Sequence, residues 1–154
     1  MARVHVDLQM RWGDQDEYGH INNVVFARYL EEARVRVLWR NAAREQTGLE
    51  RHFRGDTPDG LKMLVASQRI EFTNVLEYSE HGITVELWIG KLGGSSLEIH
   101  YEVLDAAKPE RVVVARAITV AAVVDGATLR PVRLSAEGRA AVEPWTDEPL
   151  KLRH

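Results

Sequence analysis

The sequence predicts an α+β fold in which a curved antiparallel β-sheet is wrapped around one long central helix. One strand-like segment precedes a single helical segment, and four extended segments follow it. The helical segment also has an apolar face too broad for a helix that lies on a surface. With 154 residues, 45% of them hydrophobic, the chain can bury a core, and residues 1–154 are expected to form a single domain.

The first two elements differ in the period of their apolar residues. Residues 3–12 alternate apolar and polar side chains, which predicts a half-buried strand. Residues 23–46 instead carry an apolar stripe at helical spacing. Asn22 or Asn23 is expected to cap this helix, and Gly48 to end it.

The second half of the chain reads as a run of strands. A polar loop with several glycines and prolines is expected over residues 49–60. Because four consecutive strands follow one helix, we expect an antiparallel meander with the helix on one face. A short terminal helix over residues 135–142 is expected after Ser135 as its cap. The four predicted strands cover about residues 62–75, 82–92, 95–104 and 111–124.

The composition excludes several kinds of chemistry. The chain has no cysteine, so disulfides, thiolate catalysis and cysteine-bound metals are excluded. Its six histidines show no metal-ligand spacing, and we expect neither a metal nor a cofactor. A net charge of −3 argues against nucleic-acid binding, and no window approaches a membrane span. Without an apolar leader, the sequence predicts a cytoplasmic protein.

The most informative segment joins the first strand to the helix. Residues 11–23 read Arg-Trp-Gly-Asp-Gln-Asp-Glu-Tyr-Gly-His-Ile-Asn-Asn. The start of a helix presents unpaired backbone N–H groups to a ligand. A carboxylate can act as base or nucleophile towards a carbonyl group, and such donors can stabilise the oxyanion that forms. Together they are sufficient for attacking or hydrating a carbonyl group. We therefore place the candidate site at this junction.

The junction also carries a family resemblance. The motif Asp-x-Asp-x-x-Gly-His-x-Asn-Asn before Tyr29-Leu30-Glu31, together with the order of elements, resembles the hotdog-fold acyl-CoA thioesterases, in particular the 4-hydroxybenzoyl-CoA thioesterase-like branch. The resemblance covers about residues 3–125. It implies a hotdog fold and hydrolysis of an acyl-CoA thioester to free acid and CoA. It also implies a homodimer or homotetramer with each active site at a subunit interface.

The resemblance assigns roles to residues of the junction. In this family the second aspartate of the motif is catalytic, and it corresponds to Asp16. Asp16 would act as a general base on water or as a nucleophile, and both routes stay open. Backbone N–H groups from around His20 to Val24 would hold the thioester carbonyl. Some members have a histidine where this chain has Asn23, and either CoA or acyl carrier protein fits as the carrier.

The neighbouring residues each have a functional and a structural interpretation. Asp14 is expected to be a structural hydrogen-bond acceptor in the loop. Gly19 is expected to relieve backbone strain or to let the thioester approach closely. Asn22 and Asn23 are expected as caps, one of which could orient the attacking water. His20 is either a hydrogen-bond partner of substrate, water or Asp16 or a histidine satisfied by backbone.

Residues outside the junction, Lys91 and Ser95 among them, are candidates for contact with CoA. Lys91 could meet its phosphates, and Ser95, after the Gly93-Gly94 turn, could bind pantetheine. A solvated surface charge and the polarity of a hairpin are the structural alternatives. The expected substrate-binding set is Gly19, His20, Asn22, Asn23, Val24, Lys91 and Ser95.

Two other functions stay open on the sequence. A hotdog enoyl-thioester hydratase or dehydratase would use a pair made of Asp16 and His20, if that segment is helical. The two asparagines that follow favour the thioesterase. A non-catalytic acyl-thioester-binding module is disfavoured by the presence of both Asp16 and the helix junction. The sequence leaves the acyl group open, whether aromatic, short or long.

Overall fold

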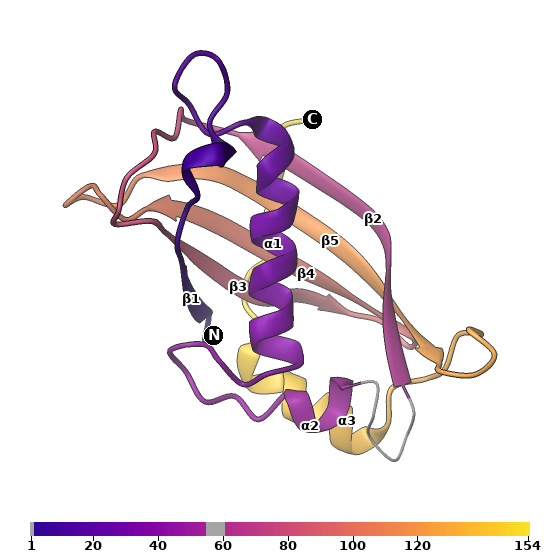
Figure 1. Ribbon diagram of the computed structural model, residues 1–154. Coiled ribbons are helices and arrows are strands. Elements are labelled where there is room, and N and C mark those ends of the chain that lie inside the picture. The colour runs from indigo at the N-terminus through magenta and orange to yellow at the C-terminus, as the bar shows by residue number, and fades with distance from the viewer. Residues whose placement is uncertain (1, 55–60) are drawn as a thin grey trace.

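The computed structural model describes residues 2–54 and 61–154. Five antiparallel strands form one sheet, and α1 (Asn23–Leu38) lies across a face of this curved sheet (Figure 1). The predicted α+β class with an antiparallel sheet is confirmed. In the order β1-β3-β4-β5-β2, the strands are β1 (Val4–Leu8), β3 (Ile83–Leu92), β4 (Ser96–Asp105), β5 (Val113–Asp125) and β2 (Leu61–Phe72).

The strand order differs from the predicted meander. Strands β3, β4 and β5 are successive neighbours, but β2 pairs with β5 at one edge of the sheet. The chain therefore crosses the end of the sheet over residues 73–82 before β3 begins. This connection is anchored on the junction, because Leu76 is buried and its carbonyl accepts a hydrogen bond from the Ile21 N–H at 2.8 Å. The pairing of β2 with a distant strand has no local signal in the sequence.

Helix α1 begins where the sequence predicts. Asn22 lies before it in an extended conformation, and its side chain accepts a hydrogen bond from the Val24 N–H at 3.2 Å. The predicted apolar stripe is buried against the sheet. It consists of Phe26, Leu30, Ala33 and Val37.

The same helix ends eight residues before its predicted end at residue 46, so the predicted length was wrong. Asn41 has a φ of +49°, a left-handed conformation that asparagine tolerates better than most residues. The following segment runs beside β1, where the Arg44 N–H donates to the His5 carbonyl at 2.9 Å and the Arg44 side chain pairs with Asp7. These long-range contacts compete with continuation of the helix. The spacing of its apolar residues does not predict them.

Two short helices flank the α1–sheet layer. Helix α2 (Glu50–Phe53) lies within the predicted loop of residues 49–60, and residues 55–60 of that loop lie outside the described residues. Helix α3 (Ala136–Val142) confirms the predicted terminal helix, because Ser135 accepts a hydrogen bond from the Gly138 N–H at 3.0 Å. No described helix combines the length and the apolarity needed to span a membrane.

The sheet face away from α1 is covered by the C-terminal segment, which the sequence analysis missed. The Trp88 side chain donates to the Glu148 carbonyl at 3.0 Å, and the Leu150 N–H donates to Nδ1 of His100 at 2.9 Å. Trp88 and His100 are therefore buried, although alternation alone would place them on an outer face. A Cβ atom at Gly90 would lie 2.3 Å from Nε2 of His100, so the glycine makes room for the imidazole.

A cluster of ion pairs lies beside this segment. Glu102 accepts hydrogen bonds from Arg3 at 2.7 Å, Arg111 at 3.0 Å and Arg116 at 2.9 Å. Burial by itself raises the pKa of Glu102, but the bonds from Arg116 and Arg3 outweigh it and hold this pKa below its usual value. The carboxylate of Glu102 thus links β4 to β5 and to the N-terminal end of the chain.

We expect Glu102→Gln to lower the free energy of unfolding by about 1–3 kcal/mol at neutral pH, because it leaves charged donors poorly paired. The native pKa lies below the usual 4.5, so the contribution is complete above pH 4.5 and is lost as the pH falls through the native pKa. Urea unfolding at about pH 7 and about pH 3 measures the difference between variant and wild type. The exposed Glu110→Gln is the control, and an equal loss at both pH values would contradict the prediction.

Candidate active site

The junction is a tight loop closed by backbone hydrogen bonds. The Asp16 N–H donates to the His20 carbonyl at 2.7 Å, and the Gly19 N–H donates to the Asp16 carbonyl at 3.2 Å. Gly19 has a φ of +79°, a left-handed conformation that costs a glycine little and most other residues more. This agrees with the predicted role of Gly19 in relieving backbone strain. The loop fixes the segment from residue 16 to residue 20 just before α1.

The carboxylate of Asp16 is held by one of its two oxygens. Its Oδ1 accepts hydrogen bonds from the Tyr18 N–H at 2.9 Å and the His20 N–H at 3.1 Å. Its Oδ2 accepts no hydrogen bond from any described residue, and the side chain is half-buried. One oxygen therefore orients the group, and the other is available to water or substrate.

The entrance of α1 offers one unused backbone donor. Among the N–H groups of residues 20–24, only that of Asn23 has no acceptor among the described residues. Of the backbone N–H groups from His20 to Val24 that were expected to hold the thioester carbonyl, one is therefore left without an acceptor among the described residues. The other four N–H groups are used within the junction and its surroundings. That of His20 donates to Asp16, that of Ile21 to Leu76, that of Asn22 to Asp14, and that of Val24 to Asn22.

Asp14 faces away from Asp16 and towards the helix. It is buried, and its Oδ2 accepts hydrogen bonds from the Tyr29 hydroxyl at 2.7 Å and the Arg11 N–H at 2.8 Å. Burial, with a smaller effect of Asp14, raises the pKa of Tyr29 above its usual value. These contacts agree with the structural role expected for Asp14. The hydroxyl of Tyr29 also joins the junction to α1, a contact that the sequence analysis missed.

His20 contributes to the loop through its backbone. Its side chain is half-buried and makes no hydrogen bond with any described residue. The segment from Asp16 to His20 is a loop rather than a helix turn, and the two side chains are not hydrogen-bonded to each other. The condition set for a hydratase-type pair of Asp16 and His20 is therefore not met.

Lys91 and Ser95 lie at the other end of the sheet. The junction follows β1, whose Leu8 pairs with Ile83 at the beginning of β3. Lys91 lies at the end of β3, and Ser95 follows in the β3–β4 turn. The structure therefore does not bring these two residues to the junction of the same chain, and their role in substrate binding stays a prediction.

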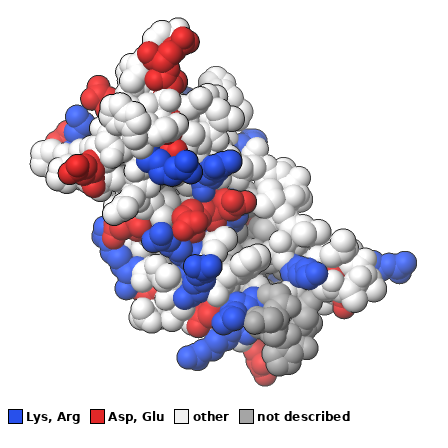
Figure 2. Space-filling model, viewed as in Figure 1, with Lys and Arg blue, Asp and Glu red and all other residues white. Residues whose placement is uncertain are grey.

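A polar cavity of about 880 Å³ opens beside the junction between β1 and α1, and Arg11, Asp14, Arg28 and Tyr29 are among its lining residues. On the face that carries α1, acidic and basic side chains are interspersed (Figure 2). Among the described residues, no group of three or more His, Asp or Glu side chains could hold a metal ion.

The model of one protein family matches residues 10–145, and that family is described as a thioesterase-like superfamily. The chain belongs to the thioesterase-like superfamily. The predicted hotdog thioesterase family is thereby confirmed, and thioester hydrolysis is the chemistry of this enzyme class. A comparison with curated proteins finds no match.

Solved structures share the fold of this superfamily member over nearly its whole length. A predicted thioesterase from Bacillus stearothermophilus has 20% identity and a TM-score of 0.76, with 96% of this chain and 99% of that chain covered. A thioesterase from Thermus thermophilus, complexed with coenzyme A and Zn, has 25% identity and a TM-score of 0.69, with 90% and 96% covered. A DHNA-CoA thioesterase from Staphylococcus aureus has 16% identity and a TM-score of 0.71, with 94% and 93% covered.

Proposed function

We propose that this thioesterase-superfamily protein hydrolyses acyl-CoA thioesters to a free acid and CoA, with Asp16 as the catalytic residue. One observation carries the proposal: Asp16 is fixed through Oδ1, keeps Oδ2 unbound, and lies in the loop that leads into α1. The similarity to a Thermus thermophilus thioesterase that was complexed with coenzyme A supports CoA as the carrier.

The chemistry divides between Asp16 and the start of α1. As a general base, Oδ2 of Asp16 takes a proton from the water that attacks the thioester carbonyl. The tetrahedral intermediate then collapses, the C–S bond breaks, and the CoA sulfur takes up the proton. As a nucleophile, the same oxygen attacks the carbonyl directly, the C–S bond breaks, and CoA leaves as a thiolate that takes up a proton. Water then cleaves the acyl anhydride to the free acid and restores the Asp16 carboxylate. On either route the N–H of Asn23 would stabilise the oxyanion, because the other donors of residues 20–24 are used.

Release of free thiol from a panel of acyl-CoAs tests this function. A thioesterase releases CoA from at least one member of the panel, with the free acid as the second product. The enoyl-thioester hydratase, the alternative named from the sequence, adds water to carbons 2 and 3 and releases no thiol. A non-catalytic binding module releases none either.

The single-domain organisation and the cytoplasmic location remain predictions that rest on the sequence.

The oligomeric state is part of the proposal, and we expect at least a homodimer. β2 is an edge strand of 12 residues whose Leu64 and Val65 are 43% and 50% exposed. A long apolar edge is a template for pairing with another strand, and a second copy can extend the sheet there. Light scattering at micromolar concentration is expected to give a dimer or tetramer. A fully active monomer of about 17.5 kDa would contradict this prediction.

We expect His20→Ala to lower turnover by roughly 10- to 100-fold, since only a positioning side chain is lost. The His20 backbone, which holds Asp16, stays in place. The acidic limb of the pH profile of kcat/KM should persist in the variant, because the proposed base, Asp16, is still present. The measurement is this profile in wild type, His20→Ala and the control His52→Ala. If His20 were the base, His20→Ala would instead remove the acidic limb of the profile.

A further inference from the structure

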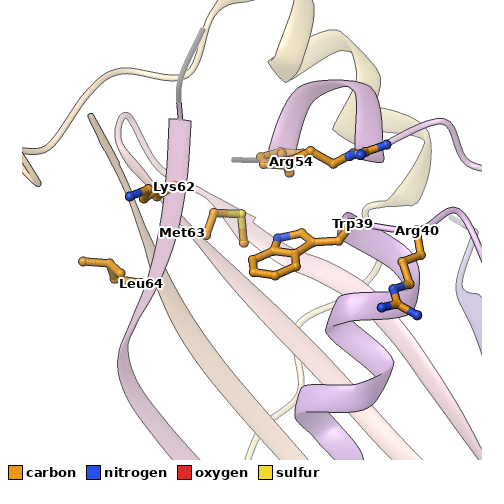
Figure 3. A pocket seen from close by; sticks show the side chains of 7 residues that line it. Trp39, Arg40, Arg54, Lys62, Met63 and Leu64 are labelled. Carbon is orange, nitrogen blue, oxygen red and sulfur yellow. The ribbon is translucent and has the colours of Figure 1, made fainter. Parts of the chain in front are cut away.

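The two faces of the sheet are closed in different ways. On the α1 face, a cavity of about 760 Å³ stays open beside the end of α1 and the beginning of β2, and the Trp39 and Met63 side chains point towards each other across it (Figure 3). On the opposite face, the C-terminal segment of residues 146–154 crosses the sheet, and in Figure 1 it passes behind the strands in yellow. One bond of this crossing depends on a side chain that titrates.

The C-terminal segment is held strand by strand. At β3 the Asp147 N–H donates to the Ile89 carbonyl at 3.2 Å, and at β4 the Leu150 N–H donates to Nδ1 of His100 at 2.9 Å. At β2 the two carboxylate oxygens of Glu71 accept the N–H groups of the segment's last two residues at 3.0 and 2.7 Å. The His100 imidazole is therefore the anchor in the middle of the crossing.

The bond to Leu150 fixes the protonation state of His100. An imidazole nitrogen that accepts an N–H bond carries no proton, so the ring is neutral and its one proton is on Nε2. Nε2 lies 3.2 Å from Oε1 of Glu98, which accepts that proton in a hydrogen bond. A second proton would go on Nδ1, where it would point at the Leu150 N–H, and two donors repel each other. A protonated His100 and a bound Leu150 N–H therefore exclude each other.

The ring itself has little room to move. His100 is 1% exposed and packs against Trp88, with ring centroids 5.9 Å apart. Its Nε2 lies over Gly90, where a Cβ atom would be only 2.3 Å away. The segment, in contrast, is at the surface, with Glu148 and Lys151 both exposed. A clash between ring and segment is therefore relieved by movement of the segment.

Charged groups from all neighbouring elements act on His100. Burial lowers the pKa of His100 below its usual value of 6.5, and it outweighs the Glu98 carboxylate on β4, which raises this pKa. Arg69 on β2 lowers it further. The other charges on these strands and on the segment are those of Glu86 and Lys91 on β3, Glu102 on β4, Arg116 on β5, and Glu148 and Lys151.

The carboxylates that hold the segment keep their charge where His100 titrates. Asp147 pairs with Arg3 at 2.9 Å, and this bond holds the pKa of Asp147 below its usual 3.8. Two backbone N–H groups of the segment hold the pKa of Glu71 below its usual 4.5. Both carboxylates are therefore ionised throughout the range from about pH 5 to about pH 7.5, and the anchor that changes there is His100.

We propose that the C-terminal segment is a pH-sensitive strap, closed while His100 is neutral and released from the middle of the sheet when the imidazole takes up a proton. Release uncovers His100 and Trp88, whose indole N–H is bonded to the Glu148 carbonyl in the closed form. The open form binds one proton more than the closed form. Its equilibrium constant therefore rises by up to about tenfold per pH unit below the usual pKa of 6.5, and it levels off at the lower pKa of the closed form.

Amide hydrogen exchange, corrected for the intrinsic pH dependence of exchange, measures opening of the segment. Between about pH 7.5 and about pH 5.0 we expect the opening constant at the Leu150 amide to rise by up to about 30-fold. Amides in the middle of β4 should stay protected, because only the segment opens. An opening constant that is equal at the two pH values overturns the proposal. A rise shared equally by the β4 amides is global unfolding and overturns it too.

His100→Asn identifies the sensor. The asparagine Oδ1 lies about where Nδ1 of histidine lies, so it can accept the Leu150 N–H, but it takes up no proton in this range. We expect opening in this variant to be independent of pH. His154→Gln is the matched control, because His154 binds Glu71 through its backbone, and it should keep the wild-type pH dependence. A pH dependence that persists in folded His100→Asn overturns the proposal.

Glu98→Gln replaces His100→Asn if circular dichroism shows that the asparagine variant does not fold. It removes the carboxylate that favours the charged imidazole, so the rise in opening should shift to lower pH. An unshifted rise in Glu98→Gln overturns the proposal.

Discussion

Asp16→Asn is expected to fold like the wild-type protein and to lose thioester hydrolysis by a factor of about 10²–10⁴. The asparagine keeps Oδ1, which can still accept the N–H groups of Tyr18 and His20, so the loop retains its closure. The amide nitrogen replaces Oδ2, the oxygen without a partner among the described residues, and it can neither accept a proton usefully nor attack a carbonyl.

The matched control is Glu17→Gln, which removes an exposed carboxylate from the next position of the loop. Thiol release, the thermal midpoint of unfolding and binding of an uncleavable acyl-CoA analogue are measured on both variants. Asp16→Asn should retain the midpoint and the binding and lose only turnover, while Glu17→Gln retains all three. Near wild-type turnover in Asp16→Asn would remove Asp16 from the mechanism.

Local patterns in the sequence predicted the beginning of α1 better than its end, and they predicted both ends of α3. The Asn22 cap before α1 and the Ser135 cap before α3 depend on bonds within three residues, and both are present. The end of α1 depends on Arg44, whose partner Asp7 is on β1. An apolar period describes which face of a helix is buried, and it carries no information about such competing contacts.

The arrangement of the strands also depends on long-range contacts that local patterns do not predict. Alternation identified the strands, but the position of β2 beside β5 depends on pairing across the sheet. The burial of Trp88 and His100 depends on the C-terminal segment, which lies 50 residues or more further along the chain. The residues next to β2, Trp88 and His100 in the sequence do not indicate these long-range contacts. The α+β class, in contrast, can be predicted from the types and order of the elements alone.

Within the candidate site, the sequence did not resolve the geometry of the two aspartates. Spacing by two places Asp14 and Asp16 on one side if the backbone is extended. The short 3₁₀-helix (Trp12–Asp14) and the loop after it separate them, so that Asp14 bonds Tyr29 and Asp16 bonds the loop backbone. The family resemblance, rather than the spacing, was the reason to expect a catalytic role for Asp16 and a structural role for Asp14.

Asn23→Pro is expected to lower kcat by about 10²–10³, the usual effect of removing one oxyanion donor. Asn23 is the first residue of α1, and its N–H has no acceptor among the described residues. Proline is well tolerated at this first position, because the missing N–H makes no bond within the helix. Asn22 has φ −63° and ψ 136°, an extended conformation that a residue before proline favours. The substitution therefore removes a single backbone donor and leaves α1 intact.

Asn23→Ala is the control, because it deletes the side chain and keeps the N–H group. Both variants should retain the helical circular dichroism of the wild type, and Asn23→Ala should retain most of its kcat. If alanine lowers kcat as much as proline, the side chain of Asn23 acts on the water or substrate, and the backbone does not carry the effect. If a folded Asn23→Pro turns over at the wild-type rate, the oxyanion is not held at the entrance of α1. The pair of variants thus separates a backbone donor from a side-chain donor at the same residue.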